Sequence, residues 1–153
     1  GAALVQSSFG DRGHLEVAVV ESGRLALYWR DDAPPYEWHG PIFFGGPGFC
    51  GAPALVQGNL GGHAGNFELV VAVQGGGMAH YSRSNNQQGC PWWGPTYFGS
   101  ETVSALSLIQ SNFGQQGHLE VIAVEKGQTM LYWRDDAPPY EWHGPEAIHP
   151  HPI

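Results

Sequence analysis

Positive charge is scarce in this 153-residue chain. It has one lysine, Lys126, and five arginines against 14 acidic residues, and its formal net charge is −8. Since nucleic-acid phosphates and anionic membrane surfaces are held by Lys and Arg, both are poor partners for this chain. The sequence also lacks any apolar run of about 18 residues, so it predicts no membrane-spanning helix.

Cysteine is rare as well. The two cysteines, Cys50 and Cys90, both lie in Gly/Pro-rich stretches, which suits one disulfide in an oxidising compartment. Sequence spacing does not give the distance between the two sulfurs, so a disulfide and two unpaired thiols are both open. The disulfide alternative favours a secreted or extracellular location.

Glycine and proline are abundant instead. The 23 Gly and 12 Pro residues together make up nearly a quarter of the chain. Each interior Gly costs a helix about 1 kcal/mol and each Pro about 3 kcal/mol, which argues against a helical bundle. Hydrophobic residues (42%) and aromatic residues (12%) nevertheless predict a packed core rather than disorder. The length suits one repeat domain over residues 1–153.

The chain consists of three copies of one unit, at about residues 3–46, 52–100 and 105–148. Residues 4–41 align with 108–145 at an offset of 104, and 28 of these 38 positions are identical. The middle copy is more divergent: Gly-His-Leu-Glu-Val becomes Gly-Asn-Phe-Glu-Leu, and Trp-His-Gly-Pro becomes Trp-Trp-Gly-Pro. Self-similarity at a period of about 50 residues is typical of repeat architectures.

Each unit has the pattern of short strands. In the first unit, β-branched and aromatic residues cover Leu4–Ser7, Leu15–Glu21, Leu25–Arg30 and Tyr36–Phe43, and turns rich in Gly, Pro and Asp separate them. No segment has the apolar spacing of a helix. The predicted fold class is therefore all-β, with four strands in each of three units.

Two architectures contain three units of four strands. The unit length, and a regular four-strand pattern with a tryptophan near the last strand, favour a β-propeller built of four-stranded blades. A β-trefoil is the alternative. Three blades do not close a ring, because a propeller needs about four to eight. We therefore expect a homodimer that completes a six-bladed ring, or a chain that is a fragment of a longer propeller.

The repeat unit also resembles a known family. It runs Gly-x-Leu-Glu-Val, a short Gly turn, an aromatic pair followed by Arg, and Trp-x-Gly-Pro. This pattern resembles the repeats of the PLL-like bacterial β-propeller lectins and, more distantly, those of tectonin-type propeller lectins, over about residues 3–146. The resemblance implies glycan binding, with fucose-type monosaccharides as ligands, at several sites between or at the edges of blades. Known members close a ring of more blades in one chain, so the ring size stays open here.

The strongest candidate site is a turn, rich in aromatic and polar residues, that occurs identically in the first and third units. Aromatic faces stack on the C–H patches of sugars, carboxylates accept hydrogen bonds from hydroxyls, and Arg and His donate them. The candidate residues are Trp29, Arg30, Asp31, Asp32, Tyr36 and His39 in unit one, and Trp133, Arg134, Asp135, Asp136, Tyr140 and His143 in unit three.

The middle unit differs at these positions. It has Arg83, Asn85 and Trp93 as candidate ligand residues, and Ser82 in place of the tryptophan, so its site is expected to differ or to be lost. One further tryptophan per unit is expected in the core: Trp38, Trp92 and Trp142.

Two charged positions recur in all three units. They are Arg30, Arg83 and Arg134, and Glu16, Glu68 and Glu120. Salt bridges between blades would explain both sets. Alternatively, the arginines donate hydrogen bonds to sugar hydroxyls. The sequence leaves both interpretations open.

These patterns predict a carbohydrate-binding lectin that is non-catalytic and multivalent, with glycans as partners and with no cofactor or metal. Adjacent Asp residues in a turn diverge, whereas a glycosidase needs two carboxyl groups facing one bond. Weak binding sites also gain avidity when repeated. A propeller scaffold that binds proteins is the alternative, and a glycosidase is less favoured.

Overall fold

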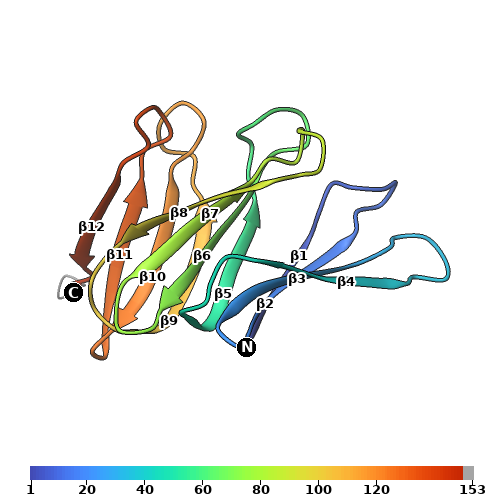
Figure 1. The fold of residues 1–153 in the computed structure, drawn as a ribbon. Helices are drawn as coiled ribbons and strands as arrows, with labels where there is room; N and C mark the ends of the chain where they lie inside the picture. Colours follow the sequence, from blue (N-terminus) through green and yellow to red (C-terminus); the bar gives the residue numbers. More distant parts are fainter. Residues whose placement is uncertain (150–153) are drawn as a thin grey trace.

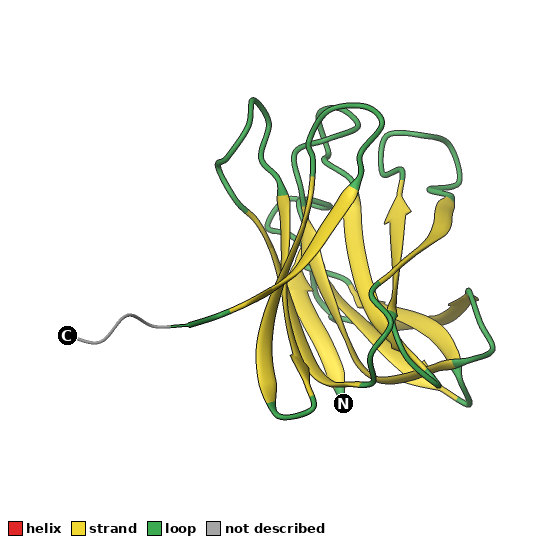
Figure 2. Cartoon of the chain, turned by 90° about the vertical axis from the view of Figure 1, so that its left-hand side faces the viewer, coloured by secondary structure: helices red, strands yellow, loops and turns green. Residues whose placement is uncertain are grey.

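The computed structural model describes residues 1–149, and every regular element in this range is a β-strand (Figures 1 and 2). The strands are β1 (Ala2–Gln6), β2 (Leu15–Glu21), β3 (Arg24–Arg30), β4 (Trp38–Phe44), β5 (Phe49–Gln57), β6 (Phe67–Val73), β7 (Met78–Arg83), β8 (Trp92–Phe98), β9 (Val103–Gln110), β10 (Leu119–Glu125), β11 (Gln128–Arg134) and β12 (Trp142–Ala147). Within residues 1–149 there is no helix long and apolar enough to cross a membrane.

The strands form three separate four-stranded antiparallel sheets. Each sheet contains four consecutive strands in chain order: β1–β4, β5–β8 and β9–β12. Figure 1 shows the sheets side by side, with the first in blue at the right and the third in orange and red at the left. Strand β5 contacts β1 and β2, and β9 contacts β5 and β6, so the sheets stack through their first two strands. This is the predicted arrangement of propeller blades, and the β-trefoil alternative falls away.

Two apolar cores join the sheets. In the middle sheet, Phe67 and Leu69 of β6 face the first sheet, whereas Val70 faces the third. Successive side chains of a strand point to opposite faces, so a strand with a sheet on either side must be apolar at nearly every position. This explains why residues 69–73 of β6 form a continuous apolar run instead of the alternation of a half-exposed strand.

The recurrent Trp-x-Gly-Pro motif marks an irregularity between the third and fourth strands of each sheet. The pairing register shifts there in all three sheets. The motif glycines, Gly40, Gly94 and Gly144, have φ angles of 111°, 128° and 115°, and a Cβ at each would lie 2.7 Å from a carbonyl oxygen of the third strand. Only glycine fits this conformation and this close approach, so the motif is required by the backbone.

The outer faces of the first and third sheets are uncovered in the single chain. Large apolar side chains are exposed on both faces: Leu4, Trp38 and Phe43 on the first sheet, and Ile109, Phe113 and Ile148 at the third. Exposed apolar surface of this kind can mark an interaction site.

Candidate ligand-binding site

The predicted cluster of unit one lies where β3 ends and β4 begins, and it is divided between two faces of the sheet. Trp29 pairs with Glu16 of β2, and both line a pocket against the second sheet. The next residue, Arg30, lies on the opposite face, with its guanidinium 5.3 Å from the centroid of the Tyr36 ring. The grouping of Trp29 with Arg30 and Tyr36 in one pocket is therefore wrong, because strand alternation separates them.

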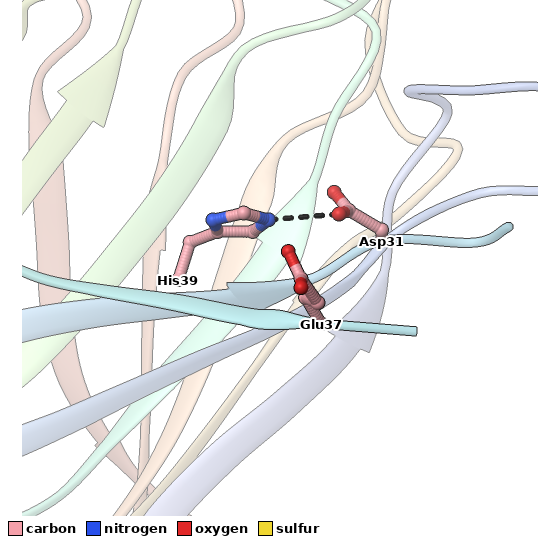
Figure 3. A group of neighbouring side chains, drawn as sticks. All are labelled: Asp31, Glu37 and His39. Carbon is pink, nitrogen blue, oxygen red and sulfur yellow. Dashed lines mark hydrogen bonds and ion pairs between the residues drawn. The ribbon is translucent and has the colours of Figure 1, made fainter. Parts of the chain in front are cut away.

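Asp31, Glu37 and His39 form a compact polar group (Figure 3). His39 Nε2 lies 2.8 Å from Asp31 Oδ2, and the His39 ring stacks on Trp29 with centroids 5.2 Å apart. The backbone N–H of Asp31 donates to the Glu37 carbonyl at 3.0 Å, which closes the loop between the strands. Asp31 thus orients the His39 ring, and the His39 ring packs against one face of the Trp29 indole.

The third unit repeats this arrangement. His143 lies 2.8 Å from Asp135 and stacks on Trp133 with centroids 5.3 Å apart. In both units the Asp, Glu and His ligand atoms lie within 4.8 Å of one another, so this is where the described residues could hold a divalent cation. The His–Asp hydrogen bond already accounts for the closest approach, and the side chains of His39 and Asp31 are each more than a third exposed.

Asp32 and Asp136 are used inside the fold. The Asp32 carboxylate accepts hydrogen bonds from the backbone N–H groups of Arg12 and Gly13, the latter at 3.0 Å. These bonds, the one from Arg12 above all, hold its pKa below the ordinary value for Asp, and Asp136 has the same arrangement in unit three. Both carboxylates anchor the loop before the second strand of their sheet, so their predicted role as ligand residues finds no support in the geometry.

The predicted residues of the middle unit also separate. Asn85 is buried, accepts a hydrogen bond from Arg83 Nε at 2.7 Å, and donates to the Gly65 carbonyl at 2.8 Å. It therefore orients Arg83 and leaves no free group for a ligand. Trp93 is 56% exposed on β8, and its indole N–H donates to Ser84 Oγ.

A pocket of about 300 Å³ lies between the first and second sheets. The first sheet contributes Trp29 and Glu16, and the second contributes Arg83 and Trp92. The Arg83 guanidinium lies 5.7 Å from the ring of Phe9, which also lines the pocket from the first sheet. The pocket thus combines aromatic surface with a carboxylate and a guanidinium from different sheets.

Glu16 is almost completely enclosed in this pocket, at 3% exposure. Burial raises the pKa of its carboxyl, while a hydrogen bond from Ser7 Oγ at 2.9 Å and the charge of Arg83 act to lower it. Burial in turn lowers the pKa of Arg83, and the nearby groups Cys90 and Glu16 oppose this. The two charges therefore support each other across the junction between sheets.

The corresponding space between the second and third sheets is occupied by polar side chains. Glu68 is 1% exposed and lies 2.8 Å from His80 Nε2, and it accepts a hydrogen bond from Ser82 at 2.6 Å. His80 and Ser82 stand where the first sheet has Leu27 and Trp29. The expectation that the middle unit differs therefore has a physical basis: the tryptophan is absent and the carboxylate is already satisfied.

Two predicted residues of unit three line a different hollow. Tyr140 and His143 border a space of about 630 Å³ between β8 and β12, together with Tyr97 and Trp142. Unlike the pocket at Trp29, this hollow lies at the outer strands.

The tryptophans expected in the core behave in two ways. Trp92 stacks on Phe44, and Trp142 stacks on Phe98, each with centroids 3.9 Å apart, so both pack between sheets as predicted. Trp38 is 53% exposed, because no other sheet of residues 1–149 packs against the outer face of β1–β4. The core assignment is wrong for Trp38 in the single chain.

Both cysteines are free thiols, so the disulfide alternative is not formed. Cys50 Sγ lies 3.8 Å from the Ala72 carbonyl, and Cys90 Sγ lies 3.8 Å from the Asn85 carbonyl. Cys90 lines the junction pocket, whereas Cys50 borders a separate small hollow near β9.

Glu16 and Phe9 are pocket residues that are absent from the ligand residues predicted from the sequence. The signal in the sequence that points to Glu16 is the recurrence of one glutamate and one arginine in all three units. This recurrence fits either a salt bridge between blades or an arginine that binds the ligand. Strand alternation would have placed Glu16 beside Trp29, since the two residues face each other across β2 and β3.

No protein-family model matches the sequence, and no curated protein matches it either. The fold is similar to the solved structure of the BP39L lectin from Burkholderia pseudomallei, with a TM-score of 0.72 and 23% sequence identity. The match covers 97% of this chain and 41% of that lectin, so the chain spans about two fifths of its length. At this identity the likeness shows the fold, which agrees with the bacterial lectin architecture implied by the sequence resemblance. The likeness to tectonin-type lectins stays a prediction.

Proposed function

We propose that the chain is a lectin that binds a monosaccharide unit of a glycan in the pocket between its first and second sheets. The observation that carries this proposal is the placement of Trp29 opposite Arg83 and beside Glu16 in a pocket of about 300 Å³. This volume is at the lower end of the range for small-molecule sites. The indole offers a flat apolar face, and the charged groups offer hydrogen-bond partners for hydroxyls.

Two further points support a sugar as the ligand. The similar solved structure is that of a lectin, although at 23% identity the likeness shows only the fold. The resemblance of the repeat unit to PLL-like lectins implies fucose-type ligands, which makes L-fucose the first monosaccharide to test.

Binding without catalysis fits the pocket better than hydrolysis does. A glycosidase needs two carboxyl groups about 5 to 9.5 Å apart on either side of the scissile bond. Among the described residues that line this pocket, Glu16 is the only one with a carboxyl group. Multivalency would come from several pockets per assembly, in a homodimer whose two chains supply the six sheets of a closed ring.

A protein-binding scaffold is the second candidate, and the exposed aromatic side chains of β8 favour it. Trp93 and Tyr97 are 56% and 65% exposed on this outer strand. Such surface is typical of protein interfaces.

A glycan array with inhibition by free monosaccharides tests the proposal. A lectin should bind a restricted set of glycans, and a free monosaccharide should compete for them. The Trp29→Ala variant should lose the site between the first and second sheets and so bind fewer sugar molecules per chain, whereas Trp93→Ala, which changes an exposed tryptophan away from the pocket, should keep the full number. An unchanged number of sugar sites per chain in a folded Trp29→Ala variant, or no glycan binding by the wild type, would overturn the proposal.

A further inference from the structure

Each internal junction brings a glutamate of one sheet opposite an arginine of the next. Glu16 and Arg83 line the same pocket at the first junction. Burial raises the pKa of Glu16, and the charge of Arg83 opposes this. At the second junction, burial lowers the pKa of Arg134 and the charge of Glu68 opposes it. The same juxtaposition of a glutamate and an arginine thus occurs twice, although neither pair forms an ion pair within 4.0 Å among residues 1–149.

The same pairing is left incomplete at the two ends of the stack. Glu120 lies on the outer face of the third sheet, where its Oε2 is buried but has no hydrogen-bond partner among residues 1–149. Glu16 and Glu68, by contrast, both accept hydrogen bonds. Arg30 lies on the outer face of the first sheet, with Tyr36 as its aromatic neighbour. A buried carboxylate oxygen without a hydrogen-bond partner is unfavourable, so a donor or cation is expected opposite Glu120.

The aromatic stack between sheets is incomplete at the same ends. Trp92 and Trp142 each stack on a phenylalanine at the end of the preceding sheet. The corresponding residues at the open ends are Trp38, which is 53% exposed, and Ile148, which is 51% exposed. The first sheet therefore has an unstacked tryptophan, Trp38. The third sheet has an exposed apolar side chain, Ile148, at the repeat position of the phenylalanines on which the other tryptophans stack.

Half of the ligand pocket also stands open on the third sheet. A hollow of about 290 Å³ on its outer face is lined by Phe113, Glu120 and Leu131. These residues occupy the repeat positions of Phe9, Glu16 and Leu27 in the pocket between the first and second sheets. Trp133, the counterpart of Trp29, pairs with Glu120 across the strands. The hollow lacks the arginine and the tryptophan that a following sheet would supply.

We propose that a second copy of this chain supplies the missing arginine and tryptophan. Arg30 and Trp38 of one copy then complete a ligand pocket with Glu120 and Trp133 of the other. The charge complementarity of the two open faces identifies the occupant, because the first sheet offers the cation that the third sheet lacks. We call the contact between the third sheet of one copy and the first sheet of the other the seam. In a twofold dimer the seam occurs twice and closes a ring of six sheets. Six lies within the range of about four to eight blades that close propellers, whereas three copies would give nine. The seam pocket rests on the proposed sugar-binding function, but the Glu120–Arg30 seam does not.

Charge reversal tests the seam by measuring mass. Arg30→Glu alone, or Glu120→Arg alone, places like charges at both seams, so each variant should be monomeric at 16.5 kDa in analytical ultracentrifugation. An equimolar mixture of the two variants restores opposite charges at both seams and should sediment at twice that mass. If a single variant does not fold, the Arg30→Glu/Glu120→Arg double variant, with both charges reversed in one chain, should still dimerise.

The matched control is Arg12→Glu, which makes the same charge change at an exposed loop position and should leave the dimer intact. Four results would overturn the seam: a monomeric wild type, a trimer or open polymer, dimeric single variants, or a mixture of variants that fails to associate.

L-fucose titration then tests the pocket. The dimer should bind two molecules per chain, one at each tryptophan pocket, and the monomeric Arg30→Glu variant should bind one. Trp29→Ala should leave one site per chain in the dimer, and Trp29→Ala/Arg30→Glu should leave none. One site per chain in the wild-type dimer would overturn the seam pocket. If neither the wild type nor any variant binds L-fucose, the fucose-binding function is overturned, and so is the ligand pocket at the seam. The mass measured by ultracentrifugation would still show whether the dimer forms through the seam.

Discussion

The rings of Phe44 and Trp92 stack face to face across the junction of the first two sheets, 3.9 Å apart with 5° between their planes. Phe98 and Trp142 repeat the contact at the second junction, at the same distance with 1° between planes. Each stack ties the last strand of one sheet to the last strand of the next. The tryptophan of Trp-x-Gly-Pro thus joins blades, while its glycine permits the register shift between strands.

Trp92→Ala should destabilise the fold, because it removes one half of this stack and leaves a cavity beside Phe44. The expected loss in the free energy of unfolding is about 3 kcal/mol, near the lower end for large buried aromatics because Trp92 keeps some exposure. Urea denaturation followed by circular dichroism measures it. Trp93→Ala changes the exposed neighbouring residue and should stay within about 0.5 kcal/mol of the wild type. A larger loss for Trp93→Ala would contradict the assignment.

Trp29→Ala should weaken binding and keep the fold, since Trp29 forms a wall of the pocket and is only half-buried. Losing its flat face should cost the junction pocket at least about 1.4 kcal/mol in binding free energy, or tenfold in Kd for L-fucose. Titration calorimetry gives the affinity, and the thermal midpoint shows whether the fold is kept. Trp29→Phe retains an aromatic face, so its affinity for L-fucose should lie between those of the wild type and Trp29→Ala. If Trp29→Ala unfolds the protein while Trp92→Ala does not, the assignment of Trp29 to the pocket wall and of Trp92 to the core is wrong.

Much of the fold could be predicted because its signals are local. Period-two alternation and Gly/Pro turns gave the second strand of unit one at Leu15–Glu21, as observed, and the third within one residue. Sequence identity between units one and three predicted that their loops are alike, and the pairs His39–Asp31 and His143–Asp135 confirm it at 2.8 Å each.

The site was predicted less well because its contacts are distant in sequence. Asp32 bonds to backbone N–H groups about twenty residues earlier, and Asn85 bonds to the carbonyl of Gly65. Nothing in the turn sequence shows that these side chains are already engaged. The partner of Trp29 in the pocket is Arg83, which belongs to another repeat and approaches only when the sheets stack.

Removing the Arg83 charge should destabilise the chain because Glu16 would remain buried without its cation. Arg83→Met retains most of the side-chain packing, and the expected loss in the free energy of unfolding is about 2 to 3 kcal/mol. The double variant Glu16→Gln/Arg83→Met should lose less than the sum of the single changes, since it leaves no uncompensated charge. Arg12→Met, at an exposed position, serves as the control and should be nearly neutral. Strict additivity of the two changes in urea denaturation would show that Glu16 and Arg83 do not interact.

The carboxylates of Asp32 and Asp136 should make stability depend on pH in the acid range. Hydrogen bonds from the backbone N–H groups of Arg12 and Gln116 hold their folded-state pKa values below 3.8, the ordinary value for Asp. A carboxyl group whose pKa is lower in the folded state stabilises the fold fully above its unfolded pKa, and this contribution disappears as the pH falls through the folded pKa.

Asp32→Asn/Asp136→Asn should therefore be less stable than the wild type near pH 7, and the difference should shrink steadily as the pH is lowered below about 4. Urea midpoints for the two proteins, measured at both ends of this range, give the comparison. Asp11→Asn changes an exposed acid in the same loop and should show no such convergence. A wild-type advantage that stays constant, or grows, in acid would mean that these carboxylates do not anchor their loops through ionised hydrogen bonds.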